Sequence, residues 1–143
     1  MRAQIRNASL SRLLDDWIAA RGARALPSRH DLPPEKLREL LGDVTLFDVL
    51  GPRSFRYRLV GTRIEYGRDI RLTGTLLDEH PDQVFAEYAI AVCAEAVATR
   101  LPVWRDVDLA GRTRRFRHEV LVLPLSADGE HVDTLMSAIA PAS

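Results

Sequence analysis

The sequence predicts one α+β domain in which helices cover a largely antiparallel sheet. Its 143 residues are a usual length for a single domain. Two stretches place apolar residues at the i, i+3, i+4, i+7 spacing of amphipathic helices. Most of the remainder reads as short β-rich runs separated by turn dipeptides. Because short turns join neighbouring strands of opposite direction, these runs indicate an antiparallel sheet.

The first 42 residues are expected to form a helical extension ahead of a domain at 43–143. The first helix is predicted to end at Gly22. A shorter second helix is expected between Asp31 and Gly42. The apolar stripe of the first helix consists of Leu10, Leu13, Leu14, Trp17 and Ile18.

Two strands and one long helix are expected next. Val44–Leu50 is a β-rich run that ends at the turn pair Gly51-Pro52, and Ser54–Val60 alternates apolar residues with arginines. Residues 62–80 are predicted to form an irregular connector. Pro81 opens the longest helix, whose apolar face holds Phe85, Tyr88, Ala89, Val92, Cys93 and Ala96.

Two hairpins are predicted to join the three closing strands. A two-residue turn at residues 110–111 would set Trp104 opposite Arg117. The stronger Asp-Gly turn signal that follows would set Leu121 opposite Met136. Both registers follow from the assumption that each turn has two residues.

The middle strand of these three is expected to be buried on both faces. Residues 120–123 read Val-Leu-Val-Leu, so apolar side chains point to either side of the sheet. The long helix is expected to cover one face. The first helix is expected to cover the other, either folded back within the chain or contributed by a second subunit.

Composition and charge exclude several classes of protein. Twenty basic residues balance twenty acidic ones, so no overall positive field attracts nucleic acid or an anionic membrane. The one basic cluster, at 112–117, is interpreted as a hairpin arm offset by Asp106 and Asp108. A grip on a phosphate, a nucleic acid or an acidic partner is the alternative. No apolar run could span a bilayer and no secretory leader is evident, so a cytoplasmic location is expected.

Several short motifs occur in an order that is typical of one family. They are Pro-Ser-Arg-His-Asp at 27–31, Phe-Arg-Tyr-Arg-Leu-Val-Gly-Thr at 55–62, Leu-Thr-Gly at 72–74, Leu-Pro-Leu-Ser at 123–126 and Val-Asp at 132–133. Together they resemble the bacterial single-domain PAS family, long catalogued as a domain of unknown function. The resemblance implies a PAS-like five-stranded antiparallel sheet with helices on one face and a pocket between them. It also implies sensing or protein association rather than catalysis.

The sequence offers candidates for a small-molecule pocket. Such sites are mostly apolar and carry a few polar groups. The side chains expected to line the space between sheet and connector are Tyr57, Tyr66, Trp104, Arg105 and His118. Each has a purely structural alternative: Tyr57 in the core, Tyr66 on the surface, Trp104 stacked on the outer sheet face, and His118 as a hydrogen-bonded core residue.

No metal or prosthetic group is expected. The four histidines show no i, i+4 pair and no cysteine partner at zinc spacing. Haem and flavin are disfavoured, because neither His80 nor His118 matches the position of the haem-binding histidine in PAS domains, and Cys93 lies inside the long helix rather than before it. As the sole cysteine, Cys93 excludes an intramolecular disulfide and is interpreted as a small buried apolar residue.

The leading hypothesis is a non-catalytic sensory or adaptor module that binds a small molecule, a signalling partner such as a kinase or regulator, or both. A homodimer is also expected, with Leu10, Leu13, Leu14 and Trp17 as interface anchors. Two alternatives stay open. One is a protein-interaction module with a filled interior, and the other is a small isomerase-like enzyme with His118 as general acid or base.

Overall fold

One helix, two strands, a second long helix and three strands follow one another along the chain. The computed structural model describes residues 1–32, 37, 43–61, 71–112 and 114–141. The long elements are α1 (Ala8–Arg21), β1 (Val44–Gly51), β2 (Ser54–Val60), α4 (Gln83–Thr99), β3 (Val103–Ala110), β4 (Arg115–Leu125) and β5 (Thr134–Pro141). Short 3₁₀ turns are η1 (Arg2–Gln4), η2 (Arg29–Asp31) and η4 (Leu77–Glu79).

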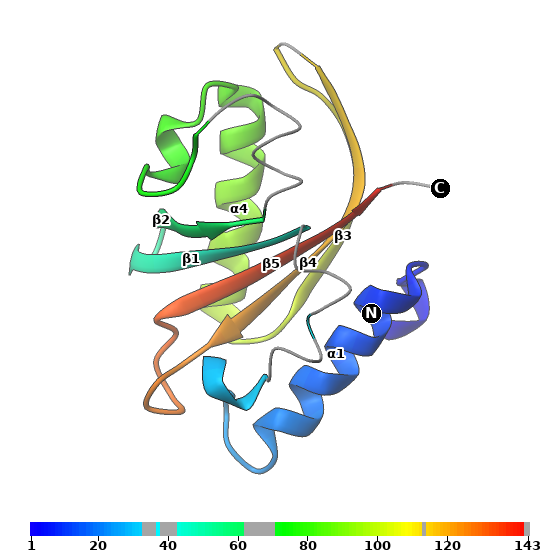
Figure 1. The fold of residues 1–143 in the computed structure, drawn as a ribbon, viewed down its shortest axis with the longest axis vertical. Coiled ribbons are helices and arrows are strands. Elements are labelled where there is room, and N and C mark those ends of the chain that lie inside the picture. Colours follow the sequence, from blue (N-terminus) through cyan, green and yellow to red (C-terminus); the bar gives the residue numbers. More distant parts are fainter. Residues whose placement is uncertain (33–36, 38–42, 62–70, 113, 142–143) are drawn as a thin grey trace.

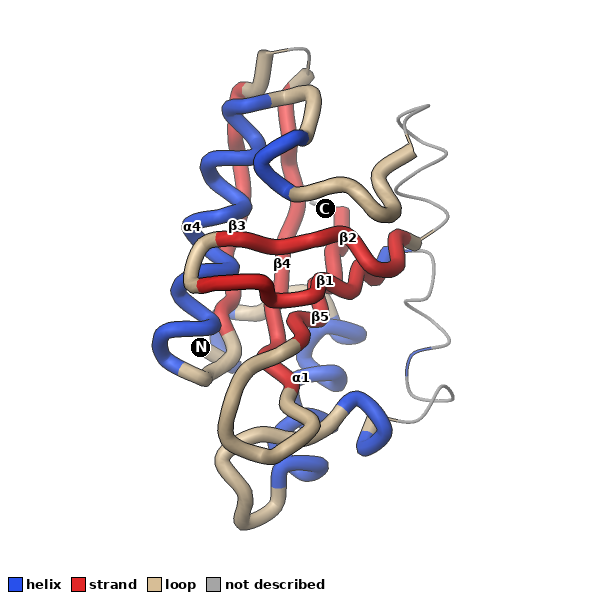
Figure 2. Tube along the Cα trace, turned by 90° about the vertical axis from the view of Figure 1, so that its left-hand side faces the viewer, coloured by secondary structure: helices blue, strands red, loops and turns tan. Residues whose placement is uncertain are grey.

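The five strands form one antiparallel sheet in the order β2-β1-β5-β4-β3. Its strands change direction steadily from β2 to β3, as Figure 2 shows, which is the twist that L-residue strands favour. Gly51 pairs with Ser54 across the first turn, so β1 and β2 lie within one residue of their predicted bounds. The predicted α+β class and five-stranded antiparallel sheet are confirmed.

The sheet separates two apolar cores (Figure 1). Helix α4 packs on one face, where Val92 and Cys93 meet Val122. Helix α1 packs on the other, where Leu10 meets Leu121. Successive residues of β4 alternate between the two cores because side chains alternate along a strand. The predicted burial of β4 on both faces is confirmed, although β5 rather than β4 is the central strand. The helix that covers its second face belongs to the same chain.

The predicted hairpin registers were wrong, although the predicted faces were right. Trp104 lies opposite Leu121 rather than Arg117, because the β3–β4 connection, residues 111–114, is centred about two residues later than the predicted turn at 110–111. Leu121 lies opposite Ala138 rather than Met136, because the β4–β5 connection, residues 126–133, is centred about one residue later than the predicted turn at 128–129. Both shifts are by an even number of residues, which keeps every side chain on its predicted side of the sheet.

The start of α1 is anchored to the sheet by a buried carboxylate. Glu119 of β4 is 3% exposed, and its two oxygens accept hydrogen bonds from the backbone N–H groups of Arg6 (2.8 Å) and Asn7 (2.9 Å). Asn7 is the N-cap of α1, and its side chain accepts from the N–H of Leu10. Arg6 also pairs with Asp106, which lies opposite Glu119 on β3. The anchor therefore satisfies both the buried charge and two backbone donors.

The middle of α1 is anchored by a tryptophan. Trp17 is 1% exposed, and its Nε1–H donates to the carbonyl oxygen of Pro124 at 2.9 Å. β3 begins at Val103, opposite Val122, so Pro124 lies beyond the last β3–β4 pair. A proline is tolerated there because no β3 partner requires its missing N–H.

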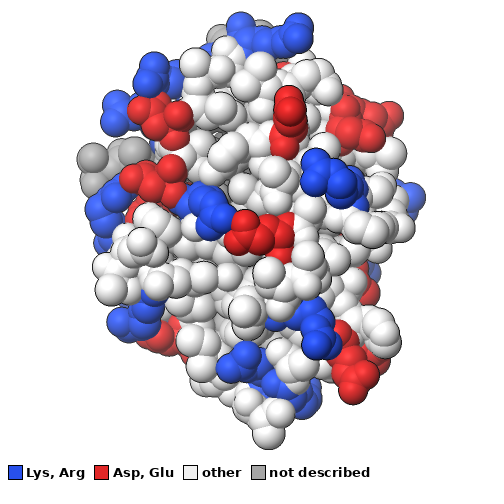
Figure 3. Space-filling view, turned by 180° about the vertical axis from the view of Figure 1, so that it is seen from behind, with Lys and Arg blue, Asp and Glu red and all other residues white. Residues whose placement is uncertain are grey.

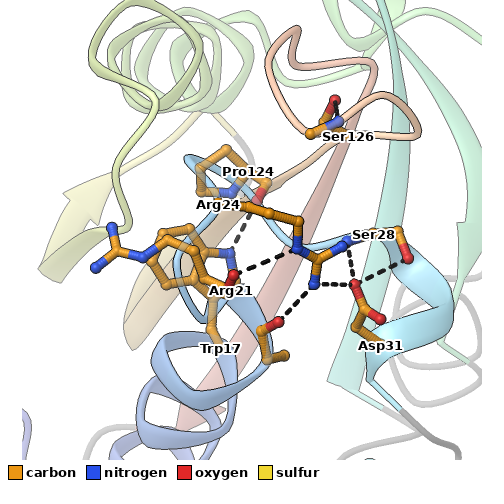
Figure 4. A network of polar contacts seen from close by, with 9 residues as sticks. Trp17, Arg21, Arg24, Ser28, Asp31, Pro124 and Ser126 are labelled. Atoms are coloured by element: carbon orange, nitrogen blue, oxygen red, sulfur yellow. Dashed lines mark hydrogen bonds and ion pairs between the residues drawn. The ribbon is translucent and has the colours of Figure 1, made fainter.

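A polar network joins the end of α1 to the segment that follows it (Figure 4). The guanidinium of Arg24 donates to the carbonyl oxygens of Ala20 and Arg21 and pairs with Asp31 at 2.7 Å. Asp31 in turn accepts from the backbone and hydroxyl of Ser28. These contacts direct the chain back along the sheet after Gly22, whose φ of +58° favours glycine.

The apolar face of α1 is not free to form the expected dimer interface. Leu10, Leu13, Leu14 and Trp17 are buried against the chain's own sheet, each 4% exposed or less, so they are not available as anchors for a second copy. The folded-back arrangement of the first helix is the one present. The short helix expected between Asp31 and Gly42 falls mostly outside the described residues, and the division of the chain at residue 42 stays a prediction.

Candidate functional site

A cavity lies between α4 and the sheet face that α4 covers. About 50 Å³ of it is open to the centre of a water-sized sphere. The strands contribute apolar walls such as Phe47, Val120 and Val122, and α4 contributes Phe85 and Val92. A volume of this size accommodates a few non-hydrogen atoms or a few waters. The cavity is therefore suited to a small molecule or to the apolar end of a larger one.

Two hydroxyl groups face the cavity from adjacent strands. Thr45 of β1 lies directly opposite Ser137 of β5, and the two residues are 4% and 8% exposed. Within the described part of the chain neither hydroxyl makes a hydrogen bond. Because both residues line the cavity, a ligand there can donate a hydrogen bond to either hydroxyl or accept one from it. The pair thus provides a polar end to an otherwise apolar space.

Two of the five side chains expected to line a pocket do so. Tyr57 of β2 (3% exposed) and His118 of β4 (8% exposed) both form part of the cavity wall. The ring of Tyr57 lies 4.8 Å from that of Phe47, which fixes it between sheet and cavity. Tyr66 lies outside the described residues. Whether these side chains contact a ligand stays a prediction.

Trp104 and Arg105 are not part of the cavity wall. Trp104 points to the opposite face of the sheet, where it packs half-buried in the α1 core, and its buried Nε1–H has no acceptor among the described residues. Arg105 is on the α4 side, but its guanidinium turns outward to pair with Glu95 at 2.6 Å and to donate to the carbonyl oxygen of Trp104. Their predicted placement was wrong, for Trp104 because of the strand's alternation and for Arg105 because of its ion pair.

Among the described residues of the cavity wall there is no aspartate, glutamate, lysine or arginine. Burial raises the pKa of the Cys93 thiol, which lines the cavity, to about 12. Burial also raises the pKa of Tyr88, against a smaller opposing effect of Arg105. Both groups are consequently neutral at physiological pH. The site suits an uncharged ligand, and Cys93 is no nucleophile there.

Sequence reasoning missed the hydroxyl pair and the Glu119 anchor. Thr45 and Ser137 were each a single hydroxyl at an inward position of an apolar strand, which is a weak signal. Glu119 was a lone acid in the most apolar strand, but its partners lie more than 110 residues earlier in the chain. Nothing local in the sequence connects them.

The outer surface carries charges of both signs. Figure 3 shows acidic and basic side chains interspersed among uncharged ones over the rear of the molecule, as the balanced composition requires. No cluster of three or more His, Cys, Asp or Glu residues with metal-site geometry is present in the described ranges. Among the described helices, none is both long and apolar enough to cross a membrane.

A comparison of the sequence with known protein families agrees with this arrangement of the sheet, α4 and the cavity. The family described as PAS domain matches residues 5–140, which is nearly the entire chain. The chain belongs to the PAS domain family. Membership supports a sensory signalling module, and PAS domains are in general non-catalytic. No curated protein sequence matches the chain significantly.

Solved PAS structures share the fold at low sequence identity. The PAS domain of BvgS from Bordetella pertussis is 15% identical with a TM-score of 0.58, and the match covers 77% of this chain and 86% of that one. A sensory box sensor histidine kinase from Vibrio cholerae is 16% identical with a TM-score of 0.56, covering 80% and 94%. The PAS domain of histidine kinase ThkA is 15% identical with a TM-score of 0.50, covering 68% and 97%. Likeness at this level establishes the fold alone.

Proposed function

We propose that this PAS domain is a sensory module that binds a small, uncharged, largely apolar molecule in the cavity between α4 and the sheet. The observation that carries the proposal is the apolar cavity with a hydroxyl pair, Thr45 and Ser137, at one side. Small-molecule sites combine these two features, an apolar wall and a few placed polar groups. We propose further that the ligand is a small molecule rather than haem or flavin, because only about 50 Å³ of the cavity is open to the centre of a water-sized sphere.

The absence of charge in the described wall supports an uncharged ligand in particular. An ion would lose its hydration and would find no Asp, Glu, Lys or Arg in the described part of the wall, and Arg105 on the same side of the sheet is paired with Glu95. A neutral molecule with one hydroxyl or carbonyl loses little and gains a contact with Thr45 or Ser137. We expect the affinity for so small a molecule to be micromolar at best, because only a few atoms contribute.

The proposal is tested by a matched series of four-carbon compounds. Binding of 1-butanol, 2-butanone, butyrate and butylammonium is followed through methyl chemical shifts in NMR spectra. We expect the two neutral compounds to shift the resonances of Val92, Val120 and Val122, and the two ions to leave them unchanged. The double variant Thr45→Val, Ser137→Ala should weaken 1-butanol binding about tenfold. Thr99→Ala, which removes an exposed hydroxyl from α4, serves as control.

Equal binding by butyrate would contradict the assignment of an uncharged ligand. No shift with any neutral compound would refute the ligand site and favour an interaction module with a filled interior. Output to a signalling protein is part of the same proposal, supported by two structural neighbours that are histidine kinases. A homodimer, if formed, uses a surface other than the buried face of α1.

A further inference from the structure

The β3–β4 hairpin ends in a concentrated positive charge. Residues 108–117 contain four arginines and one aspartate, an excess of three positive charges in a chain whose net charge is zero. Arg112, Arg114, Arg115 and Arg117 are all exposed. The hairpin tip lies at one end of the molecule (Figure 1), and basic side chains cover that end in the space-filling view (Figure 3).

Only one of these arginines is neutralised by a direct ion pair within the described residues. Arg115 pairs with Asp108 at 2.7 Å, which lowers the pKa of that carboxyl. The Arg114 guanidinium lies 4.7 Å from the ring centre of Phe116, a contact that orients it without neutralising it. Arg112 and Arg117 make no direct ion pair with a described residue, although Arg117 lies opposite Asp108 and its charge also lowers the pKa of that carboxyl. Asp106, which the sequence suggested as a partner, is paired with Arg6 instead.

The hairpin tip is held in place by the beginning of α4. Asp82, the N-cap of α4, accepts from the N–H groups of Val84 and Phe85 with one oxygen and from the N–H of Arg112 with the other (2.9 Å). The ring of Phe85 stacks on that of Phe116 with centres 4.7 Å apart. The arginines are therefore presented on a fixed support rather than on a free loop.

Gly111 is required for this close approach. A Cβ atom at that position would come within 2.6 Å of the Phe116 ring and 2.8 Å of the carbonyl oxygen of Arg114, and would also collide with the Asp82 carboxylate. Any larger residue must move the tip away from α4. The glycine that the sequence suggested as a hairpin turn thus serves contact between two elements.

We propose that the tip of the β3–β4 hairpin binds an acidic segment of a partner protein. Arginine forks pair with carboxylates in two-point contacts. Arg115 and Arg117 lie on one face of the hairpin and Arg114, over the Phe116 ring, lies on the other, so the tip offers guanidinium groups on both of its faces. A nucleic acid would need a longer run of basic side chains than this short patch, and the composition of the chain is balanced between basic and acidic residues. This inference does not depend on the cavity ligand.

The test measures binding of a fluorescein-labelled twelve-residue peptide of alternating Glu and Ser by fluorescence anisotropy at low salt. The triple variant Arg112→Gln, Arg114→Gln, Arg117→Gln should bind at least tenfold more weakly. A control triple variant with the same change of net charge, Arg53→Gln, Arg56→Gln, Arg71→Gln, should lose less than threefold. A peptide with Gln in place of Glu should not bind.

Gly111→Ala separates a positioned surface from charge alone. It keeps every arginine but displaces the tip, so we expect at least fivefold weaker binding with an unchanged circular dichroism spectrum. If this variant fails to fold, the two arginine triples still decide. Equal losses in both triples, no binding of the acidic peptide, or tighter hairpin-dependent binding of a twelve-nucleotide single strand than of the peptide would each overturn the proposal.

Discussion

The two tryptophans of the chain provide a matched test of what a buried indole N–H contributes. Trp17 donates to the carbonyl oxygen of Pro124, whereas the buried Nε1–H of Trp104 has no acceptor among the described residues. Both side chains pack in the core beneath α1. Replacing each with phenylalanine removes the same atoms, from a fully buried position at Trp17 and from a half-buried one at Trp104. The two variants therefore differ mainly in the fate of one hydrogen bond.

The expected magnitudes follow from the contacts. Trp17→Phe leaves a carbonyl without its donor, at about 1–3 kcal/mol, and loses about 1 kcal/mol of packing. Trp104→Phe loses a similar amount of packing but relieves the desolvation of an unpaired donor, at about 1–3 kcal/mol. We expect Trp17→Phe to lower the free energy of unfolding by about 2–4 kcal/mol and Trp104→Phe to raise it by about 0–2 kcal/mol.

The assay is urea unfolding followed by far-ultraviolet circular dichroism, because either substitution removes a fluorophore. At this chain length each kcal/mol corresponds to a change in Tm of about 3 °C, so thermal unfolding should separate the variants by about 6–18 °C. Equal losses of stability in the two variants, with unchanged m-values, would show that packing alone decides and that the hydrogen bond contributes nothing net.

Three further predictions concern the anchor, the thiol and the last turn. Glu119→Gln turns one acceptor into a donor that faces a backbone N–H, so we expect urea unfolding to show a stability about 2 kcal/mol lower. The exposed control Glu130→Gln should lose less than about 0.5 kcal/mol. Equal losses in the two variants would refute the anchor. Cys93, with its pKa of about 12, should react with a thiol reagent only when guanidinium unfolds the chain, and rapid labelling of the native protein would contradict its burial. The hydrogen bond to Asp128 raises the pKa of His131. The contribution of this pair to stability is therefore full below the ordinary histidine pKa and is lost as pH rises through the raised value. Asp128→Asn should lower the His131 pKa in an NMR titration, and an unchanged pKa would refute the pairing.

Local patterns were enough to predict the strands but not their registers. β1 and β2 follow from alternation and a turn pair that lie within one stretch of sequence. The β3–β4 register depends on Gly111, whose role is set by contact with Asp82 some thirty residues earlier. A local turn rule has no access to that contact. The predicted face of each side chain was still correct, because a register shift by an even number of residues leaves side chains on the same side of the sheet.

The candidate site could be predicted in part for the same reason. Tyr57 and His118 were placed correctly because their strands alternate cleanly. Trp104 and Arg105 are adjacent on one strand, so they could not both face the same cavity, and alternation alone would have excluded one of them. The hydroxyl pair required knowing that β1 and β5 are neighbours, a pairing between residues about ninety positions apart.

Strand β4, together with β1 and β5, forms a wall one strand thick between the cavity and the core beneath α1. His118, Val120 and Val122 face one side, and Glu119, Leu121 and Leu123 face the other. No position in this stretch is free to vary without consequence, because each substitution acts on one compartment and moves the backbone that the other shares. We expect β4 to tolerate fewer substitutions than any other strand. Where two substitutions in β4 are tolerated together, we expect them at neighbouring residues, one on each face, rather than at two residues of the same face.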